Sequence, residues 1–234
     1  MAAFFCEVWE HILTPDFLNR VRQKYHFEEA DWIELRTVAN QMLPWIRREA
    51  FWDRKEYHIQ ELSRPGPCEP SRPIYECVVM TLGPGIDALQ ESYSDSGLLL
   101  KSYMAEVLAC EILQDGYQAY EQFLKKTTGL HVAGYHFPGS EAAFPLELLA
   151  DLIKDYAPHI ICNSAFCITP MKSVVFLAEL TQERPSHESS ICFTCTDKHC
   201  PYRIKNHVMR RDFSDREEGL VRKGEGFSGK KVKE

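Results

Sequence analysis

No run of apolar residues in the sequence approaches the ~20 that a membrane-spanning helix needs. The first ten residues contain no lysine or arginine and carry Glu7 and Glu10, unlike the basic start of a secretory signal peptide. We therefore expect a cytoplasmic protein with no membrane partner. In that reducing compartment the nine cysteines should be thiols or metal ligands, and an odd number of them cannot all pair within one chain.

Positive charge is also scarce. Lys and Arg number 27 against 34 Asp and Glu, for a net charge of −7. Nucleic-acid binding is not expected, because it relies on an excess of basic residues. The charge is uneven: residues 203–234 hold ten Lys or Arg and six Asp or Glu, or +4, which leaves −7 − 4 = −11 on the rest. We expect residues 204–234, which are polar and charged, to form a flexible tail.

Familiar catalytic signatures are missing as well. No Ser/His/Asp or Cys/His nucleophile arrangement stands at a recognisable spacing. Leu82-Gly-Pro-Gly85 follows an expected strand, but Pro84 removes an amide donor and no Lys-Ser/Thr follows. This segment is therefore predicted to be a structural turn and not a phosphate-binding loop. Whether the chain is an enzyme stays open at this point.

What is present is ordinary globular composition, with 44% hydrophobic and 26% charged residues. A length of 234 residues suits one domain or two small ones. Four prolines and a glycine mark residues 63–73 as a loop or linker. It separates an N-terminal helical segment, residues 1–62, from residues 74–203, and we expect the first segment to extend the core.

The apolar pattern predicts both helices and strands. Before the linker, Thr14-Pro-Asp16 signals the start of one helix, and a second should run from Asp31 to about Trp52 with a break near Pro44. After it we expect a long helix, capped by Asp95 or Ser96 and ending before Gly129. The other predicted elements are a strand over 74–82, a short helix from 84, a helix over 146–153 and a late hairpin-like pair of strands over 160–162 and 173–180. This succession predicts an α+β or α/β sheet fold.

Three cysteines near the C-terminus form the most informative cluster. Cys192, Cys195 and Cys200 are separated by two and four residues, so their sulfurs can converge on a zinc ion or an iron–sulfur cluster. Proline after Cys200 favours iron–sulfur slightly, and redox-active thiols are the alternative. Such sites usually have four ligands. The fourth can come from a small molecule or from His199, Cys162 or Cys167.

Glycines, aromatic residues and histidines gather between residues 129 and 141. Glycine lets a ligand approach the backbone, and an aromatic ring can stack on a purine or a sulfonium group. The segment is therefore a candidate small-molecule loop. Glu106 and Glu111 on the long helix are expected on a solvated face unless the fold turns them inward.

Several motifs occur in an order that resembles a known family. They are Gly83 and the long helix, Phe137-Pro-Gly139 with Phe144-Pro-Leu-Glu-Leu148, Ile168-Thr-Pro-Met-Lys-Ser173, and Cys192-x2-Cys195-x4-Cys200-Pro-Tyr-Arg203. In this order they are similar to the activation (reactivation) domain of cobalamin-dependent methionine synthase, most closely to the free-standing form of anaerobic bacteria. The resemblance covers about residues 74–203.

The resemblance implies a C-shaped α+β domain with a twisted antiparallel sheet, which binds S-adenosylmethionine in a shallow groove and caps the corrin of methionine synthase. After accidental oxidation to cob(II)alamin, one electron and a methyl group from S-adenosylmethionine restore methylcobalamin. We hypothesise that a cluster at the three cysteines supplies the electron. The cobalamin belongs to the partner, a methionine synthase of methionine biosynthesis or a related corrinoid protein. The implied cofactor-binding residues are Glu111 (or Glu106), Tyr135, His136, Pro138, Gly139, Ser140, Met171 and Lys172.

The sequence departs from the family where the ligand carboxylate should bind. The family motif reads approximately Arg-Phe-Ser-Pro-Gly-Tyr, whereas this chain has Tyr135-His-Phe-Pro-Gly-Ser140. Tyr135 or His136 replaces the Arg, depending on one gap, and Ser140 replaces the Tyr. An arginine binds a carboxylate through two charge-assisted hydrogen bonds, which neither replacement reproduces.

Two main hypotheses follow. In the first, the chain is a reactivation subunit that binds S-adenosylmethionine. In the second, it is a metal- or iron–sulfur-bearing accessory or electron-transfer protein of the same fold that has lost this ligand. A third reading, an unrelated zinc-binding scaffold, predicts affinity for neither cobalamin proteins nor S-adenosylmethionine.

Overall fold

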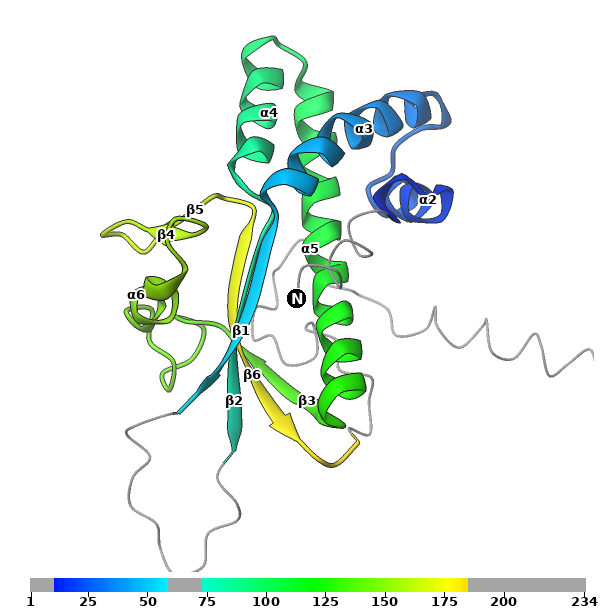
Figure 1. Cartoon of the computed structure of the whole chain (residues 1–234). Coiled ribbons are helices and arrows are strands. Elements are labelled where there is room, and N and C mark those ends of the chain that lie inside the picture. The colour runs from blue at the N-terminus through cyan, green and yellow to red at the C-terminus, as the bar shows by residue number, and fades with distance from the viewer. Residues whose placement is uncertain (1–10, 59–72, 185–234) are drawn as a thin grey trace, which may run out of the picture. The chain divides into compact units, whose positions relative to one another are not determined.

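A computed structural model of the chain describes residues 11–58 and 73–184. These residues form a four-stranded antiparallel sheet, in the order β1-β2-β6-β3, with helices packed against it (Figure 1). The predicted α+β class is confirmed. The strands of this sheet are β1 (Phe51–Tyr57), β2 (Ile74–Thr81), β3 (His131–His136) and β6 (Ser173–Thr181), and a separate hairpin consists of β4 (Ile161–Cys162) and β5 (Ile168–Thr169).

Two α-helices precede the sheet. Helix α2 (Pro15–Lys24) begins as predicted, because Thr14 is its N-cap and accepts a hydrogen bond from the amide of Phe17 at 3.3 Å. Helix α3 (Trp32–Glu49) runs through Pro44, so the predicted break is wrong. Burial of the residues on either side of Pro44 in the core offsets the hydrogen bond that proline removes. Short 3-10 turns cover His11–Leu13, Glu29–Asp31 and, later in the chain, Lys154–Tyr156.

The segments on the two sides of the predicted linker belong to one sheet. Helix α3 ends at Glu49 and not near Trp52, because β1 begins at Phe51 and pairs with β2 from Phe51↔Thr81 to Tyr57↔Tyr75. Buried side chains of α2 and α3 belong to the same apolar core as those of the later helices. The N-terminal segment thus extends the core, as expected, and it also adds a strand that was not predicted.

Helices α4 (Pro84–Asp95) and α5 (Leu99–Thr128) follow β2. The turn before α4 needs glycine, since Gly83 has φ +86° and a Cβ there would lie 2.3 Å from the Cβ of Glu49. Helix α5 ends at Gly129 in the left-handed conformation, as predicted. Its predicted start is wrong: Asp95 and Ser96 end α4, and α5 begins at Leu99. None of the helices described combines the length and apolar character that a membrane crossing requires.

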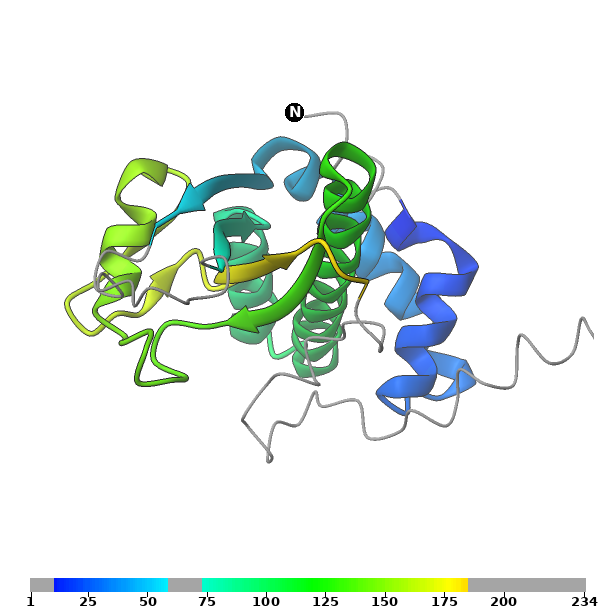
Figure 2. The same ribbon diagram turned by 90° about the horizontal axis from the view of Figure 1, so that it is seen from below.

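The sheet is buried on both faces. On one face, alternate side chains such as Val78, Met80 and Phe176 pack with helices α2 to α5. On the other, Cys77, Val79 and Leu177 are among those that pack with α6 (Leu148–Ile153) and the segments around it. Figures 1 and 2 show α5 and α6 on opposite sides of the sheet.

Three further expectations need correction. Residues 131–136 form strand β3 and are not part of a loop, because β3 pairs with β6 and buries Val132 and Tyr135. The late hairpin joins β4 to β5, whereas β6 lies between β2 and β3. Helix α6 begins at Leu148, two residues later than predicted.

Candidate functional site

His136, the last residue of β3, lies between two carboxylates. Its Nδ1 atom is 3.0 Å from Oε1 of Glu141, and its Nε2 atom is 3.2 Å from Oε2 of Glu179 on β6. Only an imidazolium can donate to both partners, because a neutral imidazole carries one N–H. The His136 side chain is 17% exposed, and the two carboxylates are 35% exposed each, so the group can be reached from solvent.

Two aromatic rings complete this group. The ring of His136 is 4.7 Å from that of Phe144 and 5.8 Å from that of Tyr75 on β2, centroid to centroid. Burial, together with the charges of Glu179 and Glu141, raises the pKa of the Tyr75 hydroxyl. We call Tyr75, His136, Glu141, Phe144 and Glu179 the β3-end cluster. Two carboxylates beside aromatic rings make it suitable for binding a cation.

Strand alternation separates the two candidates for the family's arginine. Tyr135 points to the helix side of the sheet, where it is 2% exposed and donates a hydrogen bond to Oε1 of Glu121 at 2.5 Å. Its ring packs edge-on against Tyr117 and Phe176. Burial and the Glu121 carboxylate raise the pKa of Tyr135 well above its ordinary value. Tyr135 is thus a core residue, and His136 is the one with solvent access.

The Phe-Pro-Gly-Ser motif forms a tight turn directly after β3. The amide of Ser140 donates to the carbonyl of Phe137 at 2.9 Å, and Gly139 has φ +86°, which fits the third position of a type II turn with Pro138 at the second. The hydroxyl of Ser140 also bonds to the Phe137 carbonyl, and the amide of Gly139 donates to the carbonyl of Phe144. The amides of Gly139 and Ser140 are therefore already hydrogen-bonded within the protein, and the turn places Glu141 beside His136.

Lys172 lies in a second polar group near the start of β6. Its side chain is 9% exposed and pairs with Glu106 of α5, which also accepts a hydrogen bond from Gln90 at 2.8 Å. Burial raises the pKa of the Glu106 carboxyl, but the hydrogen bonds from Lys172 and Gln90 outweigh it, so that this pKa lies below its ordinary value. Met171 is 64% exposed, and its amide donates to Asp87 of α4 at 2.7 Å.

The second polar group is distant from the β3-end cluster along the sheet. His136 pairs with Leu177, and the five residue steps from Lys172 to Leu177 span roughly 17 Å of extended chain. His136, Pro138, Gly139 and Ser140 therefore lie together, whereas Met171 and Lys172 do not join them.

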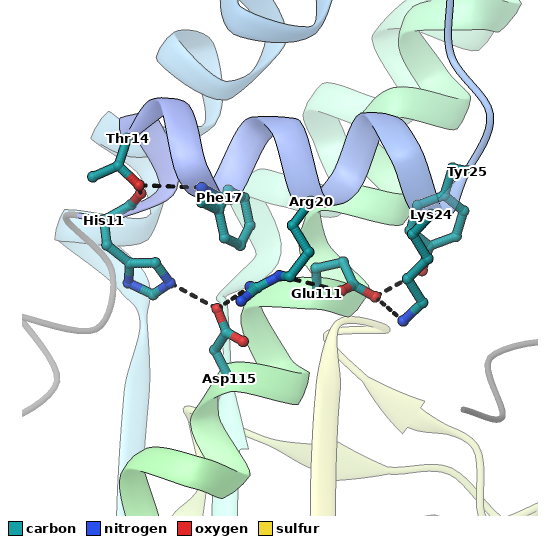
Figure 3. A network of polar contacts seen from close by, with 8 residues as sticks. All are labelled: His11, Thr14, Phe17, Arg20, Lys24, Tyr25, Glu111 and Asp115. Carbon is teal, nitrogen blue, oxygen red and sulfur yellow. Dashed lines mark hydrogen bonds and ion pairs between the residues drawn. The ribbon is translucent and has the colours of Figure 1, made fainter. Parts of the chain in front are cut away.

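Glu111 lies in a third place, between α5 and α2. It is 4% exposed, and it accepts hydrogen bonds from Lys24 Nζ at 2.5 Å and from the hydroxyl of Tyr25 at 2.9 Å. One turn further along α5, Asp115 binds Arg20 at 2.5 Å. Figure 3 shows both acids facing the side chains of α2. The fold thus turns Glu111 inward, and Glu106 is half-buried, so neither acid lies on a fully solvated face.

The predicted metal ligands Cys192, Cys195 and Cys200 lie outside the described residues, as does His199. Within residues 11–58 and 73–184, no group of three or more His, Cys, Asp or Glu side chains is placed to hold a metal ion. On the β4–β5 hairpin, Cys162 is half-buried and Cys167 is exposed.

Sequence reasoning missed three members of the β3-end cluster: Tyr75, Glu141 and Glu179. Glu179 carries a recognisable signal, because it shares a strand face with the buried residues Val175 and Leu177. An acid at such a position calls for a polar partner. That His136 is this partner could not be predicted, since β3 was not predicted.

A scan of the sequence against protein-family models gives no match, and a search of curated protein sequences gives none either.

Proposed function

We propose that this protein is a reactivation subunit for a cobalamin-dependent methionine synthase or a related corrinoid methyltransferase. In this role it binds S-adenosylmethionine and supports reductive remethylation of cob(II)alamin on the partner. The observation that carries the proposal is the placement of the family-like motifs. Phe137–Gly139 and Phe144 lie beside β3, residues 168–173 lead into β6, and β6 precedes the cysteine-containing segment in the chain.

The side chains of the β3-end cluster are suited to binding the charged groups of this ligand. S-adenosylmethionine carries a sulfonium and an ammonium group, and both favour carboxylates and aromatic faces such as those of Glu141, Glu179 and Phe144. Its carboxylate needs a cation, which His136 supplies when protonated. The amino-acid group of the ligand can exchange partners within this cluster. Its ammonium group would replace His136 as the partner of one glutamate, and the N–H of His136 that this frees would donate to the ligand carboxylate.

Under this proposal the residues of the chain bind and orient the ligand, and the ligand supplies the methyl group when bound. The partner's corrin must then approach the exposed side of the cluster. Glu111 and Tyr135 have structural roles, because the first is paired with α2 and the second is buried in the core.

One observation favours the accessory or electron-transfer function instead. The arginine of the family motif has no equivalent at the turn, where Tyr135 is buried and His136 is already paired with two carboxylates. The amides of Gly139 and Ser140 are also occupied. In this alternative the cysteine cluster is the functional centre.

The test is isothermal titration of S-adenosylmethionine into the full-length protein purified without oxygen. We expect saturable binding, with weaker binding of S-adenosylhomocysteine, which lacks the sulfonium charge. Glu141→Gln should weaken S-adenosylmethionine binding about tenfold, because it removes a charged partner. The control Glu147→Gln changes an exposed glutamate nearby and should leave binding unchanged. Absence of binding at millimolar ligand would reject this function and leave the accessory role.

A further inference from the structure

Exposed apolar side chains gather where α4 passes into α5. Leu98, Leu99 and Leu100 are consecutive and 44%, 69% and 42% exposed, and Tyr103, one turn further, is 47% exposed. They make up four of the nine large hydrophobic side chains that are exposed in the described part of the chain. Single exposed apolar residues are ordinary, but a contiguous group marks an interaction site. We call these four residues the leucine tip.

The leucine tip has a well-defined backbone. The amide of Leu98 donates to the carbonyl of Tyr93 at 2.9 Å, and the hydroxyl groups of Ser94 and Ser102 are 2.9 Å apart, which ties the end of α4 to the start of α5. The ring of Tyr103 packs edge-on against Phe27 at 5.7 Å. A surface held in this way loses little conformational entropy when a partner binds.

Acidic side chains border the leucine tip. Helix α4 contains Asp87, Glu91 and Asp95 and no lysine or arginine, and the last two acids are exposed. On the α5 side, Lys101 is the base beside the leucines, and it pairs with Glu34 of α3 at 3.4 Å. The border of the tip on α4 is therefore negative.

We propose that the leucine tip binds a basic, amphipathic segment of a partner protein. The apolar face of that segment would cover Leu99 and Leu100, and its lysines or arginines would face Asp95 and, one turn further along α4, Glu91. The charge argues against two other occupants. A second copy that docked through the same tip would bring its own acids against these, and the anionic surface of a membrane would be repelled. The inference does not depend on the proposed function.

The probe is a fluorescein-labelled helical peptide of leucine and lysine with one apolar face, and its counterpart has glutamate in place of lysine. Fluorescence anisotropy with the full-length protein should show saturable binding of the Leu/Lys peptide and none of the Leu/Glu peptide. Leu99→Ser and Asp95→Lys should each weaken binding about tenfold, because one removes apolar contact and the other reverses charge. Ile161→Ser, which changes an apolar side chain 53% exposed on β4, is the matched control and should have no effect.

Three outcomes would overturn the proposal. Equal binding of both peptides, or binding that ignores Leu99→Ser and Asp95→Lys, would mean that the tip does not recognise basic segments. A concentration-dependent dimer in analytical ultracentrifugation that Leu99→Ser abolishes would assign the tip to a second copy. Sedimentation with phosphatidylserine vesicles that the same variant abolishes would assign it to a membrane surface. Thermal melting of each variant checks that its fold is intact.

Discussion

The ammonium group of Lys172 is nearly buried and ends at Glu106, a residue 66 positions earlier in the chain. Such a pair is worth more than one on an open surface, because less water screens it. Glu106 nevertheless keeps 28% of its side chain exposed, which limits the effect. The pair holds the turn before β6 against α5, so its strength bears on the placement of the Thr-Pro-Met-Lys-Ser motif.

Replacing Lys172 by methionine should therefore destabilise the protein in a pH-dependent way. The folded-state pKa of Glu106 lies below its ordinary value of 4.5. The pair thus stabilises the folded state above the unfolded-state pKa, and this contribution is lost as the pH falls through the folded-state value. We expect Lys172→Met to cost about 1 kcal/mol at pH 7 and clearly less near pH 3.5, measured by urea unfolding.

Lys154→Met is the control for this measurement. Lys154 is 64% exposed and lies 3.9 Å from Asp151, so its loss should change the stability little at either pH. An equal loss of stability for Lys172→Met at both pH values would indicate that packing, and not the ion pair, accounts for the effect.

Among the elements, α2 and α5 are joined through buried charge as well as apolar packing. Glu111 accepts hydrogen bonds from Lys24 and Tyr25 (Figure 3). The guanidinium group of Arg20 lies 4.0 Å from Glu111 and also binds Asp115. A buried carboxylate costs free energy unless its hydrogen bonds are satisfied. Here α2 supplies these bonds, so that the helix and the acid depend on each other.

Lys24→Met should consequently destabilise the protein by about 2 kcal/mol, less than a fully unpaired buried charge costs because Tyr25 and Arg20 remain. Arg36→Met, at an exposed position on α3, should change stability by less than about 0.5 kcal/mol. Chemical unfolding measures both. In folded Lys24→Met protein the affinity for S-adenosylmethionine should be unchanged, and a large loss of affinity would instead place Glu111 among the ligand-binding residues.

The helices could be located from the sequence, although not all of their ends, whereas three of the six described strands, β1, β3 and β5, could not. Thr14 and Gly129 mark helix ends by local chemistry that a sequence displays directly. Strand β1 carries four consecutive charged residues, 53–56, and is a strand because it pairs with β2. Strand β3 contains Gly134 and an irregular register between Val132 and Gly134, which blurs its alternation. Strand pairing depends on distant residues, so local patterns do not reveal it.

The candidate site divides in the same way. The Phe-Pro-Gly-Ser motif and His136 could be selected from sequence, because a turn motif after a histidine is local. Glu179 and Tyr75 reach His136 only through the strand order β2-β6-β3. Glu111 was assigned by resemblance to a ligand site, and its position opposite α2 follows from helix packing that no local motif encodes.

At the scale of the whole molecule, both faces of the sheet are used for packing. Helices α2 to α5 cover one face, and α6 with the segments around it packs on the other. Ligands and partner proteins would then bind at strand ends, turns and helix junctions. The β3-end cluster and the leucine tip lie at such places. The cluster sits at the end of β3, and the cysteine segment follows β6 in the sequence. Under the proposed function, donor binding would fall to the β3-end cluster and electron supply to the cysteine segment, which are different parts of the chain.

This division predicts that the two functions can be separated by mutation. Cys195→Ser should lower the content of iron or zinc in protein purified without oxygen, and it should abolish reductive reactivation of a cob(II)alamin-bearing methionine synthase. It should leave the affinity for S-adenosylmethionine unchanged, because no residue of the β3-end cluster is altered. Cys77→Ser is the control, because Cys77 is 3% exposed and packs in the core on the α6 side of the sheet, where burial raises the pKa of its thiol to about 12. If Cys195→Ser protein retains full metal content and reactivation, the cysteine cluster has no part in electron supply, and the electron must come from the partner or from a separate reductase.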